Sequence, residues 1–353
     1  MKLTRLFLVA VSVSLFVSCS NDDNNNDDNT PKGAYENGFF ILNEGNSSGG
    51  SVSFASDDLA NFTSDVYKTA NPTDVAGVFL QNIFFDGDNA YVIAGGSNVI
   101  NVVNRYSFKL IAKVETGLAN PRYGVVKDGK AYVTNANTYS YSNPTTGNTD
   151  DYIAIIDLAT NKVESKIELG ATSNRILLEN NKLYITDSYN DKILVVNPAT
   201  KALETPITIG TSGDSMEAKD GILYVLRAPY GDNRSEIVKV KLSDKSVTKI
   251  TFPESLDRAG YLDIYNDKIY YTSNKSVYAI STTATAASTT AIATVSLPVG
   301  GSIYGFAVNK DKIFIADGGD FGSNSKAYIY NLSGNLQKEL TVGVGPNGFY
   351  FND

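Results

Sequence analysis

The chain has 353 residues, of which 42% are hydrophobic and 19% are charged, so it can fold and bury a large core. Its formal charge is −8, which repels phosphate backbones and argues against nucleic acid as a partner. Histidine is absent and the single cysteine is Cys19, which excludes histidine-dependent nucleophilic catalysis, intrachain disulfides, and imidazole or thiolate metal sites. No cofactor and no metal ion is therefore predicted.

Residues 1–18 are predicted to be a lipoprotein signal peptide. Lys2 and Arg5 precede an apolar run from Leu6 to Val17, which has the form of a secretory signal and is too short to span a bilayer. The run ends at Ser18 and Cys19, which resembles the site where lipoprotein leaders are removed and the cysteine is acylated. An ordinary secretory leader with an incidental cysteine is the alternative.

Residues 19–37 are predicted to be the lipidated cysteine and a flexible tether, because they are rich in Asn and Asp and offer little apolar surface to bury. The acidic stretch after Cys19 resembles the export signal of surface lipoproteins in Bacteroidetes, although a plain spacer is the alternative. We therefore expect an outer-membrane lipoprotein that is exposed at the cell surface and attached to the membrane through its lipid anchor only.

Residues 38–353 contain one repeated unit: a short strand, a tight polar turn, a strand built around an aromatic residue, a loop, and two further strands. About 45 residues per copy is the length of a four-stranded propeller blade. The seven second strands are found at 39–42, 90–93, 131–134, 183–186, 223–226, 269–272 and 313–316.

The turns before these strands are rich in Asn, Asp and Gly, which tolerate the positive φ of two-residue hairpins. Later strands, such as those at 153–157 and 193–197, are near-continuous apolar runs, as expected for sheets packed on both faces. The repeat therefore predicts sheets that stack against one another.

The two ends of this body complement each other. The first copy begins at its second strand, whereas residues 348–351 at the C-terminus form a spare first strand. Pairing them would complete one blade and remove exposed sheet edges. The predicted fold is all-β, a seven-bladed β-propeller closed by pairing of the N- and C-terminal strands.

Two segments carry a family resemblance. Residues 132–135 spell Tyr-Val-Thr-Asn, the signature of the YVTN-type (YncE-like) β-propeller repeat, and residues 155–163 are similar to the strand and turn that follow it. The opening segment, 38–46, resembles Bacteroidetes propeller lipoproteins of the DUF5074 type and surface cobalamin-binding propellers. The resemblance to the cobalamin-binding members implies a TonB-dependent outer-membrane transporter as partner.

Candidate ligand-binding residues follow from the propeller geometry. The loops between second and third strands and the crossovers between blades share one face, and they carry the long insertions and the entry to the central channel. Aromatic and polar side chains in such loops suit a small-molecule ligand. The candidates are Gln81, Asn82, Arg122, Tyr123, Tyr139, Tyr141, Asn174, Arg175, Asp214, Tyr230, Arg258, Tyr304 and Asn347. A purely structural role for any one of them is the alternative.

The resemblance implies a non-enzymatic binding protein that captures a small molecule, a corrinoid of the vitamin B12 type, and passes it to an outer-membrane transporter. Without histidine, recognition would use the corrin side-chain amides and ring faces. A protein-interaction scaffold or adhesin is one alternative. A carboxylate-based glycan lyase or hydrolase is another, because sequence does not show which acids approach each other across the channel.

Overall fold

The structure is a computed structural model that describes residues 32–352, apart from 139–148, 188, 230–233 and 257. The predicted signal peptide, Cys19 and most of the predicted tether lie outside the described residues. Within those that are described, no helix has the length and apolar character needed to cross a membrane.

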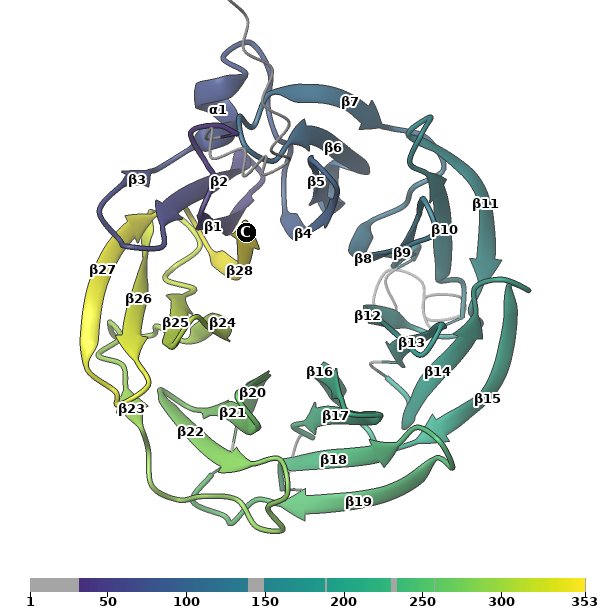
Figure 1. Ribbon diagram of the computed structural model, residues 1–353, viewed down its shortest axis with the longest axis vertical. Coiled ribbons are helices and arrows are strands. Elements are labelled where there is room, and N and C mark those ends of the chain that lie inside the picture. Colours follow the sequence, from purple (N-terminus) through teal and green to yellow (C-terminus); the bar gives the residue numbers. More distant parts are fainter. Residues whose placement is uncertain (1–31, 139–148, 188, 230–233, 257, 353) are drawn as a thin grey trace, which may run out of the picture. The chain divides into compact units, whose positions relative to one another are not determined.

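Seven four-stranded antiparallel sheets form a ring around a central channel (Figure 1). In chain order, blade 1 combines β28 (Pro346–Asn352), β1 (Gly38–Asn46), β2 (Gly49–Ser56) and β3 (Phe62–Thr63); blade 2 has β4 (Leu80–Asp86), β5 (Asn89–Ala94), β6 (Val99–Asn104) and β7 (Leu110–Val114); blade 3 has β8 (Pro121–Lys127), β9 (Lys130–Asn135), β10 (Tyr152–Asp157) and β11 (Lys162–Glu168).

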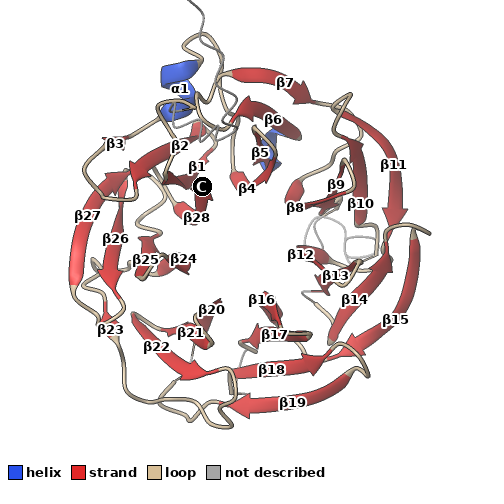
Figure 2. Cartoon of the chain, viewed as in Figure 1, coloured by secondary structure: helices blue, strands red, loops and turns tan. Residues whose placement is uncertain are grey.

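Blade 4 has β12 (Ser173–Glu179), β13 (Lys182–Asp187), β14 (Lys192–Asn197) and β15 (Ala202–Thr208); blade 5 has β16 (Gly213–Lys219), β17 (Ile222–Arg227), β18 (Glu236–Lys241) and β19 (Ser246–Thr251); blade 6 has β20 (Ala259–Tyr265), β21 (Lys268–Ser273), β22 (Ser276–Ser281) and β23 (Ala293–Thr294); blade 7 has β24 (Ile303–Asn309), β25 (Lys312–Asp317), β26 (Ser325–Asn331) and β27 (Leu336–Val342). Only α1 (Val66–Ala70) and the 3₁₀ turn η1 (Gly95–Ser97) are helical among the described residues (Figure 2). The predicted all-β, seven-bladed propeller is confirmed.

Tight turns join the first and second strands, as predicted. At Asn180–Asn181 and Asn266–Asp267 both turn residues have φ between 47° and 60°, the left-handed conformation of type I′ hairpins. Asn and Asp adopt this conformation at low cost because their side chains can hydrogen-bond to nearby backbone. These turns cover one face of the ring, and we call the opposite face the loop face.

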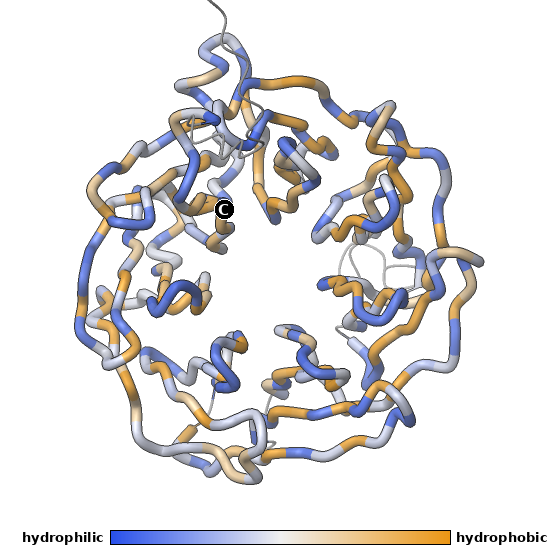
Figure 3. Tube along the Cα trace, in the orientation of Figure 1, coloured by the Kyte–Doolittle hydropathy of each residue, from blue (hydrophilic) through white to orange (hydrophobic). Residues whose placement is uncertain are grey.

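Neighbouring blades pack through seven separate apolar clusters, one at each blade-to-blade contact. Apolar residues follow the strands of every blade (Figure 3). Tyr132 packs with Leu183 between blades 3 and 4, and Tyr184 packs with Leu223 between blades 4 and 5. Both faces of each sheet are therefore buried, which explains the near-continuous apolar runs.

The ring closes where β28 pairs with β1. Phe39 of β1 lies opposite Phe351 of β28, and Leu42 lies opposite Gly348. Phe39 also packs against Phe314 of blade 7, with ring centroids 4.9 Å apart. The predicted closure by the two ends of the chain is therefore confirmed, and the last strand is held by both pairing and packing.

The folded body extends to Lys32, ahead of the Gly38 boundary expected from the sequence. Tyr35 is buried in the cluster between blades 1 and 2, and its backbone N–H donates to the carbonyl oxygen of Tyr106 at 3.0 Å. The side chain of Asn352 donates to the carbonyl oxygen of Tyr35 at 2.6 Å. This segment is thus tied to the last strand of the propeller.

The sixth blade keeps four strands despite its weak repeat. The Thr/Ala/Ser-rich run at 281–294 forms mostly loop, and only the two residues of β23 complete the sheet. Ile292 and Val295 flank this short strand and donate backbone hydrogen bonds to Val277 and Lys275. The blade therefore retains its place in the ring with a minimal outer strand.

Replacing Phe39 with alanine should lower the free energy of unfolding by about 3–5 kcal/mol, because it leaves a cavity at the closing contact. The matched control is Phe62→Ala, since Phe62 is 37% exposed on the outer strand β3. Urea unfolding followed by circular dichroism measures both. Equal effects of the two substitutions would show that the closing contact is not a special source of stability.

Candidate functional site

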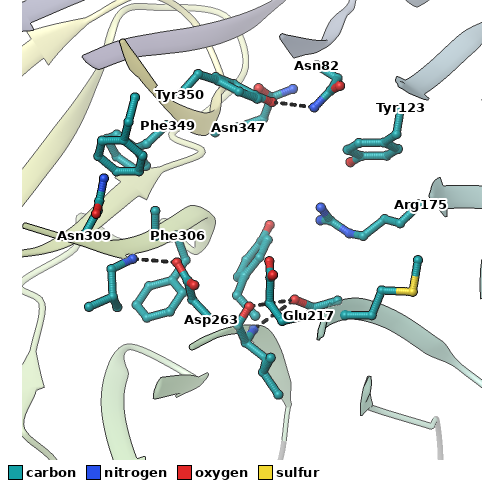
Figure 4. Close-up of a pocket in the computed structure, with 18 residues that line it drawn as sticks. Asn82, Tyr123, Arg175, Glu217, Asp263, Phe306, Asn309, Asn347, Phe349 and Tyr350 are labelled. Atoms are coloured by element: carbon teal, nitrogen blue, oxygen red, sulfur yellow. Dashed lines mark hydrogen bonds between the residues drawn. The ribbon is translucent and has the colours of Figure 1, made fainter. Parts of the chain in front are cut away.

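A cavity of about 370 Å³ lies in the central channel (Figure 4). The innermost strands of all seven blades line it, and its walls mix polar, charged and aromatic side chains. A volume of this size is at the lower end of the range for small-molecule pockets. The channel is therefore the natural place to look for a binding site.

Each innermost strand is irregular where it enters the channel from the loop face. In every blade the pairing between the first and second strands shifts register near this entry, for example between Ser173 and Ile176 of β12. Such bulges bend a strand and re-aim its side chains. In blade 4, for example, the residues within the shift are Asn174 and Arg175, which lie at the mouth of the channel.

Arg175 is the central cation of this mouth. Its Nε donates to Oδ2 of Asp214 at 3.1 Å, and its guanidinium lies 4.8 Å from the ring centroid of Tyr123. Asn174 donates to the other oxygen of Asp214 at 2.5 Å, and Arg122 donates to Asn174 at 3.4 Å. These contacts join three blades and hold the guanidinium in place, with its terminal nitrogens pointing into the cavity (Figure 4).

Glu44 connects blades 1, 2 and 7 across the mouth. It accepts hydrogen bonds from the hydroxyl of Tyr304 and from Nε2 of Gln81, the latter at 3.4 Å. Burial raises the pKa of Glu44, while the hydrogen bond from Tyr304 and the charge of Arg122 act in the opposite direction. The ring of Phe321 lies edge-on to that of Tyr304, with centroids 5.0 Å apart.

Asn82 links blades 1, 2 and 3. Its Nδ2 donates to the hydroxyl of Tyr350 at 3.3 Å, and its Oδ1 accepts from the backbone N–H of Gly124 at 3.3 Å. Asn347 donates to the carbonyl oxygen of Leu80 at 2.8 Å. Both asparagines line the cavity and also hold neighbouring blades in register, so they are structural as well as exposed to a ligand.

Two acidic residues lie further along the channel. Glu217 on β16 and Asp263 on β20 occupy equivalent positions on neighbouring inner strands, and both line the cavity. The corresponding residues of the other blades are Phe84, Val125, Leu177, Ala307 and Tyr350. Carboxyl groups therefore replace apolar or aromatic side chains at these two places only.

The environment of this pair favours the protonated form. Burial raises the pKa of Glu217, and the nearby charge of Asp263 raises it further, whereas Arg175 opposes the shift. Burial also raises the pKa of Asp263. Backbone N–H groups of Val308 and Ile264 donate to its carboxylate, both at 2.7 Å, and these hydrogen bonds act to lower the pKa. Both side chains are deep in the molecule yet remain partly accessible from the channel.

The predicted site residues fall into four groups. The cavity is lined by Asn82, Tyr123, Arg175 and Asn347. The mouth holds Gln81, Arg122, Asn174, Asp214 and Tyr304, which adjoin the cavity without lining it. Arg258 is exposed ahead of β20 and does not line the cavity, and the fourth group, outside the described residues, comprises Tyr139, Tyr141 and Tyr230. Most of these residues are among the first residues of the inner strands rather than in crossovers, because the inner strands begin earlier than the repeat in the sequence suggests.

Sequence reasoning missed Glu217, Asp263, Tyr261 and Phe306, all of which line the cavity. A signal was present for the two acids. Aligning the first strands of the seven copies, rather than the second strands, would have shown acidic residues where other blades are apolar. The aromatic residues carried no such signal, because buried core positions of propellers contain the same residue types.

Other loop acids serve the fold. Asp151 accepts hydrogen bonds from the backbone N–H groups of Ser173, at 2.7 Å, and Asn137, at 3.0 Å. Burial raises the pKa of Asp151 to about 6 despite these bonds. Asp320 accepts from Gly322 within its own turn. Nowhere in the described part of the chain do three acidic ligands gather as a metal site would require.

The fold and this channel define a β-propeller with a ligand-sized, polar and aromatic central cavity. The family described as a domain of unknown function (DUF5074) matches residues 37–261, so the chain belongs to that family. Comparison with curated proteins finds no match.

Several solved structures share the fold. A quinoprotein alcohol dehydrogenase-like protein from Bacteroides thetaiotaomicron VPI-5482 has 18% identity, covers 90% of this chain and 79% of its own, and gives a TM-score of 0.66. A functionally unknown protein from Desulfotomaculum acetoxidans DSM 771 has 14% identity, with 89% and 98% covered and a TM-score of 0.67. The computationally designed Ika8 protein has 8% identity, with 91% and 92% covered and a TM-score of 0.60. At such identities the likeness concerns the fold alone.

The raised pKa of Glu217 predicts a pH-dependent stability. A carboxyl group whose pKa is higher in the folded protein binds its proton more tightly there, so its contribution to stability is complete below the ordinary glutamate pKa of 4.5 and is lost as pH rises through the folded-state pKa. Glu217→Gln should remove this loss, on the order of 1 kcal/mol for each unit by which the pKa is raised.

Urea unfolding between pH 4 and 9 measures the effect as the difference between the variant and the unmodified protein. Asp220→Asn is the matched control, because Asp220 is an exposed turn residue outside the channel. If Glu217→Gln and the control give the same pH profile, Glu217 does not hold its proton in the folded state.

Proposed function

We propose that the protein is a non-enzymatic binding protein that takes a small molecule at the loop-face mouth of its channel. The observation that carries this proposal is a pair of hydrogen-bonded groups at the mouth of the cavity. In one, Arg175 and Asn174 donate to Asp214; in the other, Tyr304 donates to Glu44. Side chains that are ordered before binding lose little entropy when the ligand arrives. Such a mouth therefore suits recognition.

We further propose that this binding takes place at the cell surface. The support is the sequence of the leader, the cysteine at position 19 and the acidic tract after it, all of which precede the described body. A captured molecule would then be passed to an outer-membrane transporter of the TonB-dependent type. This last step rests on the resemblance to propeller lipoproteins that have such partners.

A corrinoid is our first candidate ligand. Its macrocycle is too large to enter a cavity of about 370 Å³, so it would lie across the mouth, where its side-chain amides could reach the channel entrance. Arg122, Asn174 and Gln81 supply donors and acceptors there, and Tyr304 and Phe321 supply aromatic surface. Recognition would not involve coordination of the cobalt by imidazole, since the chain has no histidine.

Isothermal titration with cyanocobalamin tests this candidate. The chain from Ser20 onward should bind it with a micromolar or lower dissociation constant, and Arg122→Ala should weaken binding by about tenfold, as expected for loss of one charged hydrogen bond. Lys162→Ala is the control, since Lys162 is exposed on the outer strand β11. Absence of binding at micromolar concentrations excludes the corrinoid.

A second candidate function is favoured by the paired carboxyl groups in the channel. Two acids with shifted pKa values in a cavity are typical of enzymes that use general acid and base catalysis, including those that cleave glycans. If this is the function, the protein should release reducing sugars or unsaturated products from a polysaccharide, and Glu217→Gln should abolish the activity. Asp220→Asn should leave it unchanged.

A further inference from the structure

We infer that the ligand group entering the channel is a cationic nitrogen, an amine or ammonium, which lies against the carboxyl groups of Glu217 and Asp263 and the aromatic side chains around them. The inference rests on the proposed binding of a small molecule in this channel and not on the corrinoid candidate, whose side-chain amides are neutral. It adds the chemical class of the group that passes beyond the mouth.

Glu217 is the acid without a partner. Its side chain points into the cavity (Figure 4), and no hydrogen-bond donor contacts its carboxyl group within the described residues. Asp263, in contrast, accepts two backbone hydrogen bonds. Because Glu217 is partly buried and no donor contacts its carboxyl group, its surroundings favour either the protonated form or a nearby positive charge.

The nearest cationic side chain, that of Arg175, does not pair with Glu217. Arg175 pairs with Asp214 and lies over the ring of Tyr123, and its charge only partly offsets the raised pKa of Glu217. Two carboxyl groups, those of Glu217 and Asp263, therefore line the cavity against one guanidinium, which is itself paired with Asp214. This balance favours a cation over an anion as the group that enters.

Aromatic walls complete the subsite. Tyr261, Phe306, Phe349 and Tyr350 line the same cavity as the two acids. Aromatic faces attract ammonium groups through the ring quadrupole, and they do so without the desolvation cost that a further carboxylate would add. The combination of carboxyl groups with aromatic faces distinguishes an ammonium ligand from a metal ion, which would need more oxygen ligands.

The inference predicts that binding releases a proton. In the empty channel, burial raises the pKa values of Glu217 and Asp263 and so favours the protonated form of the pair. The charged groups that face Glu217 are Asp263 on β20 and Arg175 on β12, and a ligand cation would change the balance between them. Because a ligand cation stabilises the ionised carboxylate, its binding would release the proton held by the pair.

The experiment uses the purified full chain and titration calorimetry at pH 7 with choline, agmatine and spermidine. The carbon isostere of choline, 3,3-dimethyl-1-butanol, supplies a neutral probe of the same shape, and citrate supplies an anion. We expect at least one cation to bind while the neutral isostere and the anion do not. Measurement in two buffers of different ionisation enthalpy should show proton release on binding.

Glu217→Gln should weaken binding of the cation by about tenfold and abolish the proton release, because a charged contact becomes a neutral one. Asp220→Asn should bind as the unmodified protein does. Binding of the neutral isostere or citrate in preference to the cations, or unchanged binding by Glu217→Gln, overturns the inference while leaving a small-molecule site. Failure of every probe and of cyanocobalamin to bind contradicts the proposed function itself.

Discussion

Pairing of β28 with β1 is the constraint on which the rest of the structure depends. The sheet of blade 1 is complete only when the last strand of the chain lies beside the first, and the channel is lined on all sides only when that blade is complete. Phe39 and Phe314 then pack across the final blade-to-blade contact. Closure also covers the inner edge of β1, which would otherwise be exposed.

The bulge repeated in each inner strand gives the channel its chemistry. A regular strand would alternate its side chains between the two faces of its blade, where they would be buried between sheets. The irregular entry instead directs side chains such as Asn174, Arg175 and Asp214 toward the mouth, where they hydrogen-bond to one another across blades. The residues that we propose to bind a ligand therefore also join neighbouring blades.

The mouth and the inner part of the channel differ in their electrostatics. At the mouth, opposite charges are paired, as Arg175 is with Asp214, and Glu44 is held by neutral hydrogen-bond donors. Further in, burial raises the pKa values of both Glu217 and Asp263, and the charge of Asp263 raises that of Glu217 further. The mouth is therefore electrostatically satisfied while the inner channel has an excess of acid, and this difference is the basis for expecting a cation there.

The sequence alone determined the fold of this protein. The spacing of the aromatic second strands, the Asn- and Asp-rich turns and the spare C-terminal strand are local features, and each is repeated often enough to specify seven blades and their closure. It also identified most of the polar residues at the mouth, including Arg175 and Asp214, because they recur at the start of the inner strands.

Only the tertiary structure decided which of these side chains meet. Arg258 comes just before an inner strand in the sequence, yet it is exposed and apart from the cavity, whereas Glu217 and Asp263 face the channel from neighbouring blades. The physical reason is that contacts across a closed ring depend on the bulge, twist and packing of several blades at once. A repeat in the sequence specifies each blade but not the small rotations that bring distant side chains together.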